Sequence, residues 1–377
     1  MVSLLSAALC LSMLAAPAGA YSRVDTEKKC SLTLTYKDTE RSFPMKDMEL
    51  RLYKVADMDA TVRFSVDKTE FKDLSINWED FSLDNEKAKE NWDTLTTTLA
   101  GYVTLDLAEH AKDEANYALK YTPVTGKPVA VDANGEVKFE NLDCGLYLLM
   151  GSALKDGRYT YTPKSTLLTL PNLEQKTEQK PGGEEVVVSE NWQYDVAANG
   201  KWDRSYKGGS GKNYISLSVL KQWEDDSSET RPGSVTVRLM KDGKEYDEVT
   251  LTAAKGWKHT WNNLDKNAEW TLAEVDVPDD YTVLVDREGN TFVVTNTGSV
   301  IIPPEPLPEG PIDPGKDPGT GGEGGDGSLN IPDEKIPQGN LPQTGVLWWP
   351  VQALTLVGLV LFVLGWADAR RVKKNEK

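Results

Sequence analysis

The chain has 377 residues and a formal net charge of −17, from 59 acidic and 42 basic side chains. An acidic chain of this kind repels a phosphate backbone, so nucleic acid is excluded as a partner, and the composition suits a soluble surface layer. The only two histidines, His110 and His259, lie in unrelated stretches. We therefore expect no histidine-based catalytic or metal site, no bound metal and no cofactor.

The N-terminal residues 1–20 are apolar and end in the sequence AGA, the small residues that signal peptidase prefers. We expect this segment to be a signal peptide, so that the mature chain begins near Tyr21 and is exported. Because Cys10 would leave with the signal, Cys30 and Cys144 would remain. An even pair of cysteines in an exported chain suggests a disulfide bond.

Residues 27–203 are expected to form a first domain, a β-sandwich that carries an inserted helical segment. Alternation at period two and turn residues predict its strands, and residues 86–107 show a helical rhythm. The strands are expected at residues 31–35, 50–55, 136–139, 145–150 and 165–171. These segments, with the sequences SLTLTYKD, MELRLYKVAD, GEVKFENLDCGLYLLM and YTPKSTLLTLP, resemble the N-terminal domain of sortase-assembled pilins.

The same alternation orients the two cysteines. Each is expected to share a face with two apolar neighbours on its strand, Cys30 with Leu32 and Leu34 and Cys144 with Leu146 and Leu148. Both thiols would then point inward, where a disulfide could tie the first strand to a late one. The alternative is two separate buried thiols.

The end of this first domain carries the sequence WQYDVAANGK at residues 192–201. Its Trp192, Val196 and Lys201 match the spacing of the pilin motif WxxxVxVYPK, although ANG replaces VYP. The resemblance implies that the Lys201 amine accepts a neighbouring subunit during polymerisation. The alternative is a sandwich strand that ends in a turn with a solvated lysine.

Residues 212–298 are expected to form a second domain, in which three strands each extend an apolar face with a polar residue. Ile215, Leu217 and Val219 lead in phase to Lys221, Trp270 and Leu272 lead to Glu274, and Phe292 and Val294 lead to Asn296. A charged residue at an inward position is costly unless it is paired or neutralised. We therefore expect these three polar side chains to meet; the alternative is a surface lysine, a surface glutamate and an asparagine turn.

The segments VLKQWEDD, RPGSVTVRLMKDG, WTLAEVDVPDDY and FVVTNT of residues 215–297 resemble the B-type domains of collagen adhesins. The resemblance implies a seven-stranded sandwich with a spontaneous Lys–Asn isopeptide bond. Carried over by position, Lys221 supplies the amine, Asn296 the amide carbon and Glu274 the catalytic carboxyl. The stretch at 270–281 also resembles the E-box of pilins.

Residues 299–340 are rich in Pro, Gly and acidic residues and cannot bury enough apolar surface to fold, so we expect a disordered linker that spans the wall. The pentapeptide Leu341, Pro342, Gln343, Thr344 and Gly345 follows.

An uncharged stretch at residues 346–366 comes next, long enough for a transmembrane helix, and then a basic tail that ends at residue 377. Together with the pentapeptide these segments resemble a cell-wall sorting signal, which implies cleavage by sortase between Thr344 and Gly345. The alternative is a permanent single-span anchor.

The fold class predicted from sequence is therefore mainly β, with two tandem immunoglobulin-like β-sandwich domains, a disordered linker and a C-terminal transmembrane helix. The predicted function is that of a structural pilin subunit, not an enzyme, secreted and covalently anchored to the Gram-positive cell wall after transient membrane retention. Its expected partners are sortase, a peptidoglycan precursor and other pilin subunits. The alternative is a monomeric wall-anchored adhesin that binds a host or matrix ligand.

Overall fold

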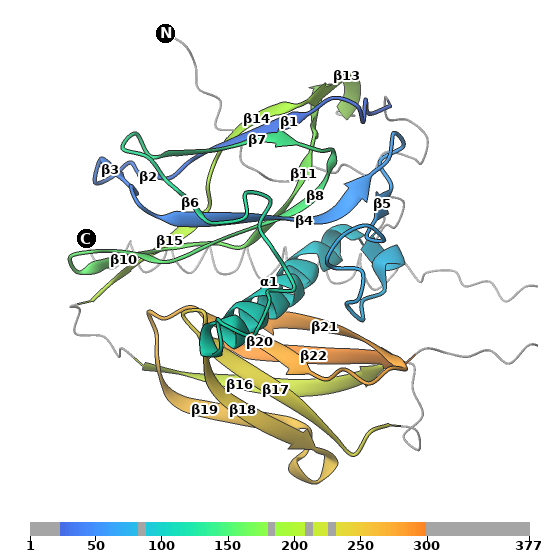
Figure 1. Cartoon of the computed structure of the whole chain (residues 1–377), viewed down its shortest axis with the longest axis vertical. Coiled ribbons are helices and arrows are strands. Elements are labelled where there is room, and N and C mark those ends of the chain that lie inside the picture. Colours follow the sequence, from blue (N-terminus) through green and yellow to red (C-terminus); the bar gives the residue numbers. More distant parts are fainter. Residues whose placement is uncertain (1–22, 82–87, 180–184, 208–213, 225–230, 299–377) are drawn as a thin grey trace, which may run out of the picture. The chain divides into compact units, whose positions relative to one another are not determined.

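The computed structural model describes residues 23–81, 88–179, 185–207, 214–224 and 231–298. The expected signal peptide, linker, sorting motif and transmembrane segment lie outside these residues. Within the described ranges, no helix is both long and apolar enough to cross a membrane. The described part consists mainly of β-strands, which confirms the prediction of a mainly β chain (Figure 1).

The first fifteen strands form a β-sandwich and smaller sheets around it. Their bounds are β1 (Cys30–Thr35), β2 (Lys37–Asp38), β3 (Phe43–Pro44), β4 (Glu49–Met58), β5 (Phe64–Ser65), β6 (Val129–Ala130), β7 (Glu136–Leu142), β8 (Gly145–Gly151), β9 (Leu154–Asp156), β10 (Tyr159–Pro163), β11 (Thr166–Leu170), β12 (Asn172–Gln179), β13 (Glu185–Gln193), β14 (Asp195–Asn199) and β15 (Trp202–Tyr206).

The two main sheets of this first sandwich have the strand orders β14-β1-β7 and β11-β8-β4-β5, with β6 paired to β4. Strands β15-β10-β9 form a third sheet, and β2-β3 and β12-β13 form two-stranded ribbons. Side chains that alternate inward from β1 and β4, such as Leu32, Leu34, Leu50 and Leu52, are fully buried in its core.

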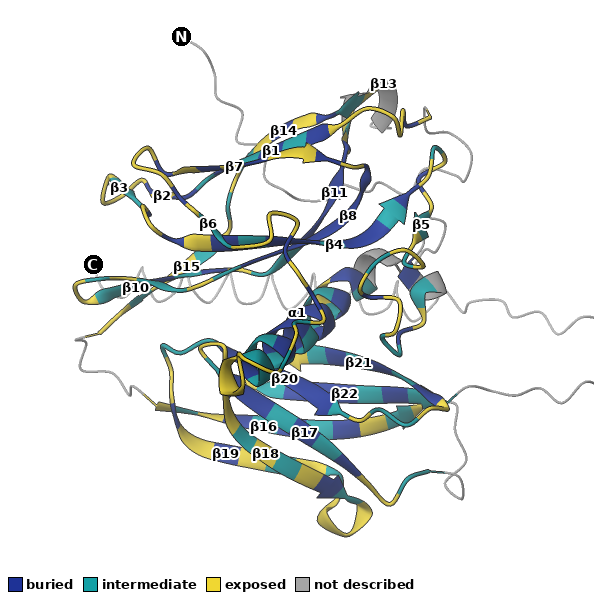
Figure 2. Ribbon diagram, in the orientation of Figure 1, coloured by how far each residue is buried: buried dark blue, intermediate teal, exposed yellow. Residues whose placement is uncertain are grey.

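The helix α1 (Ala88–Lys112) lies between β5 and β6 in the chain, where the helical rhythm at 86–107 predicted it. It follows a short 3₁₀ turn, η1 (Trp78–Phe81). Leu95, Leu99 and Val103 are spaced by four residues on one face and pack on the outer side of β4 and β8. Both faces of β8 are therefore covered, which explains why its residues from Gly145 to Met150 are all buried (Figure 2).

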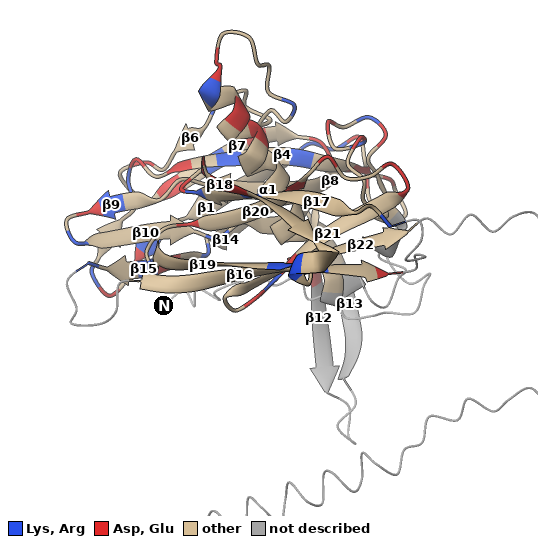
Figure 3. Cartoon of the chain, turned by 90° about the horizontal axis from the view of Figure 1, so that it is seen from below, with Lys and Arg blue, Asp and Glu red and all other residues tan. Residues whose placement is uncertain are grey.

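The remaining seven strands form a second sandwich, with the sheets β19-β16-β22-β21 and β18-β17-β20. Their bounds are β16 (Tyr214–Glu224), β17 (Ser234–Lys241), β18 (Lys244–Thr252), β19 (Lys258–Asp265), β20 (Trp270–Val275), β21 (Tyr281–Glu288) and β22 (Thr291–Gly298), with a 3₁₀ turn η2 (Ala253–Lys255). The first strand, β16, pairs in parallel with the last, β22. Charged side chains of both signs are spread over loops, strands and helix α1 (Figure 3).

Helix α1 also contacts strands β20 and β21 of the second sandwich, and both sandwiches belong to one compact unit. The Thr98 hydroxyl accepts a hydrogen bond from the Val285 amide at 2.8 Å and lies 3.2 Å from the Val285 carbonyl oxygen. The Val283 amide donates to the Ser75 carbonyl at 2.7 Å. These contacts satisfy backbone groups on β21, the edge strand of its sheet, which would otherwise need another partner.

Candidate functional site in the second sandwich

The three polar residues expected to meet in the second sandwich come from three strands. Lys221 lies on β16 and pairs with Val294 of β22, while Asn296 lies two residues further along β22. Glu274 lies on β20, in the opposite sheet. Inward-facing residues alternate along all three strands, so the lysine and asparagine project from one sheet towards the glutamate of the other.

The structure brings these three side chains together inside the core. Lys221 is 3% exposed, and Glu274 and Asn296 are fully buried. The Lys221 Nζ lies 4.0 Å from Glu274 Oε2, and Asn296 Nδ2 donates a hydrogen bond to Glu274 Oε1 at 2.8 Å. The amine, the amide and the carboxyl therefore share one pocket walled by apolar side chains such as Leu217, Val219, Leu272, Phe292 and Val294.

The Lys221 amine is held by backbone carbonyl groups of its own strand, β16, and of the neighbouring strand β22. Its Nζ donates to the Gln222 carbonyl at 2.7 Å and to the Val294 carbonyl at 3.4 Å. It also lies 4.0 Å from the centroid of the Trp223 ring, a position that favours a cation. These contacts fix the end of a long side chain that would otherwise have many rotamers.

Two oxygens of this cluster, Glu274 Oε2 and Asn296 Oδ1, are buried and make no hydrogen bond. An unsatisfied buried polar atom costs about 1–3 kcal/mol, so a folded core seldom keeps two of them side by side. Burial raises the pKa of the Glu274 carboxyl, against the opposing effects of the Lys221 charge and the Asn296 hydrogen bond. A raised pKa favours the protonated acid, which can give a proton to a neighbouring group.

The two cysteines of the first sandwich are buried free thiols in this structure. Cys30 shares the sandwich core with Leu32 and Leu34, as its phase predicted. Burial, followed by the neighbouring Cys144 thiol, raises the pKa of Cys30 to about 12. The two thiols are thus close to each other, although no bond joins them.

The orientation predicted for Cys144 relative to its strand is wrong. Cys144 packs in the sandwich core with Cys30, whereas Leu146 and Leu148 lie on the opposite face of β8, against helix α1. Cys144 precedes the first residue of β8, so the alternation of the strand does not extend to it. The thiol points inward, but for a different reason from the one that the sequence suggested.

Lys201 lies between β14 and β15 and is exposed. Its carbonyl accepts a hydrogen bond from the Lys164 amide at 2.9 Å, which fixes the backbone at this turn. The preceding Gly200 sits directly over the Tyr36 ring, where an added Cβ would lie 2.1 Å from the nearest ring atom. The amine of Lys201 therefore projects into solvent from a well-packed turn.

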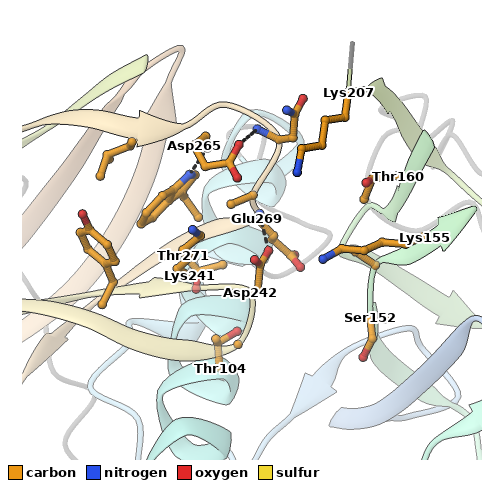
Figure 4. Close-up of a pocket in the computed structure, with 18 of the residues that line it drawn as sticks. Thr104, Ser152, Lys155, Thr160, Lys207, Lys241, Asp242, Asp265, Glu269 and Thr271 are labelled. Carbon is orange, nitrogen blue, oxygen red and sulfur yellow. Dashed lines mark hydrogen bonds between the residues drawn. The ribbon is translucent and has the colours of Figure 1, made fainter. Parts of the chain in front are cut away.

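A cavity of about 750 Å³ lies among residues of both sandwiches, and sequence reasoning did not find it. Its lining includes Lys155, Lys207, Lys241 and Glu269, and Figure 4 shows the Lys155 side chain directed towards Glu269. Burial raises the pKa of Glu269 to about 7. No periodic signal could have identified this cavity, because its walls come from segments far apart in the chain.

The part of the chain that the structure describes contains no group of three or more His, Cys, Asp or Glu side chains placed to hold a metal ion. The sorting motif at residues 341–345 lies outside the described ranges.

Residues 217–297 match the Cna protein B-type domain. The collagen adhesin of Staphylococcus aureus is 34% identical over 109 residues, which are 26% of this chain and 9% of the adhesin. The chain thus spans less than a tenth of this relative.

Two solved structures show weaker likeness. A single B repeat unit of the collagen-binding surface protein of Staphylococcus aureus is 20% identical, covering 46% of this chain and 80% of the repeat, with a TM-score of 0.22. The full-length major pilin SpaD from Corynebacterium diphtheriae is 16% identical, covering 74% of this chain and 67% of the pilin, with a TM-score of 0.26. The similarity to the Cna protein B-type domain extends over residues 217–297, which include most of the second sandwich.

Proposed function

We propose that this protein is a structural pilin subunit whose second domain, residues 212–298, is locked by an isopeptide bond between Lys221 and Asn296. The observation that carries the proposal is the burial of an amine, a carboxyl and an amide in one core, with Lys221 Nζ 4.0 Å from Glu274 and Glu274 2.8 Å from Asn296. Buried polar groups in such a cluster fit reacting partners better than a stable ion pair.

The reaction joins two side chains and releases ammonia. The neutral Lys221 Nζ attacks the Asn296 Cγ, and a new C–N bond forms while the carbonyl electrons move to Oδ1. The Glu274 carboxyl takes up the proton that the attacking nitrogen loses and gives its own proton to Asn296 Nδ2, the nitrogen that donates a hydrogen bond to Oε1 at 2.8 Å before the reaction. Collapse of the intermediate breaks the Cγ–Nδ2 bond, so an amide and one NH₃ result. Each molecule reacts once, so this is maturation rather than enzymatic turnover.

Attachment to the cell surface would use the C-terminal segments. A sortase would cleave between Thr344 and Gly345 and transfer the Thr344 carboxyl to an amine of a peptidoglycan precursor or of another subunit. The pentapeptide at 341–345, followed by the apolar stretch at 346–366 and the basic tail, supports this step. The signal-like residues 1–20 support export, and retention in the membrane would be transient.

Lys201 is the amine that we assign to subunit joining. It ends the pilin-like sequence at residues 192–201, and its exposed position between β14 and β15 leaves it accessible to a large enzyme. We further propose that, after export, a two-electron oxidant such as an extracellular thiol oxidase removes two electrons and two protons from the thiols of Cys30 and Cys144. The resulting disulfide would close the first domain, residues 27–203.

The second candidate function is that of a monomeric wall-anchored adhesin with a host or matrix ligand. The 34% identity to a collagen adhesin favours it, although the alignment covers 9% of that protein. Under this alternative, Lys201 would be an ordinary surface lysine.

Intact mass of the mature form, residues 21–344, tests the cross-link. We expect the native protein, after reduction of its disulfide, to be lighter than its sequence mass by about 17 Da, the mass of the expelled ammonia. Glu274→Ala should remove this deficit, whereas Lys258→Ala, a change of an exposed lysine on β19, should keep it. A native protein at its full sequence mass would contradict the proposal.

A further inference from the structure

Helix α1 of the first sandwich lies directly on the strand that carries Glu274. A Cβ added to Gly101 would lie 2.4 Å from the Leu272 carbonyl oxygen, so the helix backbone touches β20 two residues before Glu274. Only glycine allows two backbones to approach this closely. On the same helix, Ala108 packs against Met240 and Ala273 of the second sandwich.

Tyr102, the residue after Gly101, reaches the core of the second sandwich. Its ring packs against the apolar cluster that surrounds the three polar residues, as well as against the cluster beneath α1. Its hydroxyl is buried and has no hydrogen-bond partner. Burial, and then the charge of Glu274, raise the pKa of Tyr102.

Tyr102 and Glu274 therefore present complementary unsatisfied atoms, a hydroxyl that can donate and an Oε2 that can accept. We propose that Tyr102 is a positioning residue for the isopeptide reaction, donating a hydrogen bond to Glu274 Oε2 while the amide forms. This inference rests on the proposed cross-link between Lys221 and Asn296.

The physical effect of this hydrogen bond would be to fix the orientation of the Glu274 carboxyl group. A donor on Oε2 would stop the group from rotating, and so would keep Oε1 beside Asn296 Nδ2, from which it accepts a hydrogen bond at 2.8 Å. The first domain would thus complete the reaction centre of the second, and cross-linking would be efficient only after α1 has docked.

The rate of cross-linking tests this role. Residues 21–344 are purified unfolded, before cross-linking, refolded by dilution, and sampled for the fraction that has lost about 17 Da. Tyr102→Phe should slow the loss about tenfold, the effect of losing one hydrogen bond in the reaction, while leaving the melting temperature close to that of the native protein. Tyr53→Phe is the matched control, because the Tyr53 hydroxyl is also buried and unpartnered but lies in the cluster beneath α1.

The pH profile separates a positioning role from a packing role. The reaction uses protonated Glu274, so its rate should fall as the pH rises past the pKa of this carboxyl. A hydrogen-bond donor favours the charged form and lowers that pKa, so losing the Tyr102 hydroxyl should move the fall in rate to higher pH. Equal rates for native protein and Tyr102→Phe, or equal slowing and an unshifted profile in both tyrosine variants, would overturn the inference. A native protein that never loses the 17 Da would instead overturn the cross-link itself, and the role of Tyr102 with it.

Discussion

At the residue scale, the placement of Lys221 and Glu274 is costly for an ordinary ion pair. Moving two charges into an apolar core costs several kcal/mol for each ion, and good hydrogen-bonded geometry is needed to offset it. Here the closest approach is 4.0 Å, and Glu274 Oε2 has no hydrogen bond. A neutral amine beside a protonated carboxyl avoids most of this cost, and it is also the state from which the amide can form.

The raised pKa of Glu274 predicts a pH dependence in a variant that cannot cross-link. In Lys221→Met the carboxyl stays buried without the charge that lowers its pKa. The folded state then holds its proton above pH 4.5, where the unfolded state has lost it, so the free energy of unfolding should fall as pH rises from 4.5 to the raised folded pKa. The slope approaches about 1.4 kcal/mol per pH unit within this window.

Urea unfolding at a series of pH values measures this slope. The double variant Lys221→Met/Glu274→Gln is the control, since it carries the same change at Lys221 but has no titrating carboxyl at position 274. If both variants show the same dependence on pH, Glu274 does not have a raised pKa in the folded protein.

At the scale of elements, α1 is buried on more than one side, because it packs on β4 and β8 of its own sandwich and on β20 and β21 of the other. Thr98 is central to the contact of α1 with the second sandwich, since its hydroxyl accepts a hydrogen bond from the Val285 amide on the edge strand β21. The ion pair between Glu109 and Arg238 adds a polar contact near the end of the helix.

Replacing Thr98 with Val should leave the Val285 amide buried without a partner and lower the free energy of unfolding by about 1–3 kcal/mol. The Val285 amide should also exchange with solvent faster. Thr97→Val is the matched control, because the Thr97 hydroxyl donates to the Asp93 carbonyl of its own helix. Equal stability of the two variants would show that α1 does not hold β21 in solution.

Alternation along a strand predicted the second sandwich better than the first. Lys221, Glu274 and Asn296 could be placed from sequence because each continues the two-residue alternation of the apolar side chains before it on its own strand. Strand β8 has two buried faces, so its apolar run does not distinguish them, and the phase assigned to Cys144 was wrong. The second contact of α1, and with it Tyr102, could not be predicted, because a helical rhythm does not reveal which distant strands a helix touches.

At the scale of the whole molecule, the proposed isopeptide bond would join the first and last strands of the second sandwich, β16 and β22, which lie side by side in parallel. A tensile force applied to the two ends of this domain would then be carried by the covalent bond between these strands, so the strands would not separate. A subunit in a chain of pilins under tension would benefit from such a link.

Lys201→Ala should abolish the high-mass ladders of covalently joined subunits in cell-wall extracts, if Lys201 is the acceptor amine. Lys164→Ala, a change of an exposed lysine near the same turn, should leave the ladders intact. Immunoblots of wall digests compare the two. A single band from native cells would favour the monomeric adhesin instead.

The most direct test of the account is the isolation of the cross-linked peptide. Proteolysis of the native protein, followed by fragmentation in a mass spectrometer, should yield one branched peptide in which Lys221 and Asn296 are joined, lighter by about 17 Da than its two parts together. Recovery of separate linear peptides, with Lys221 as a free amine and Asn296 as an intact amide, would contradict the central claim.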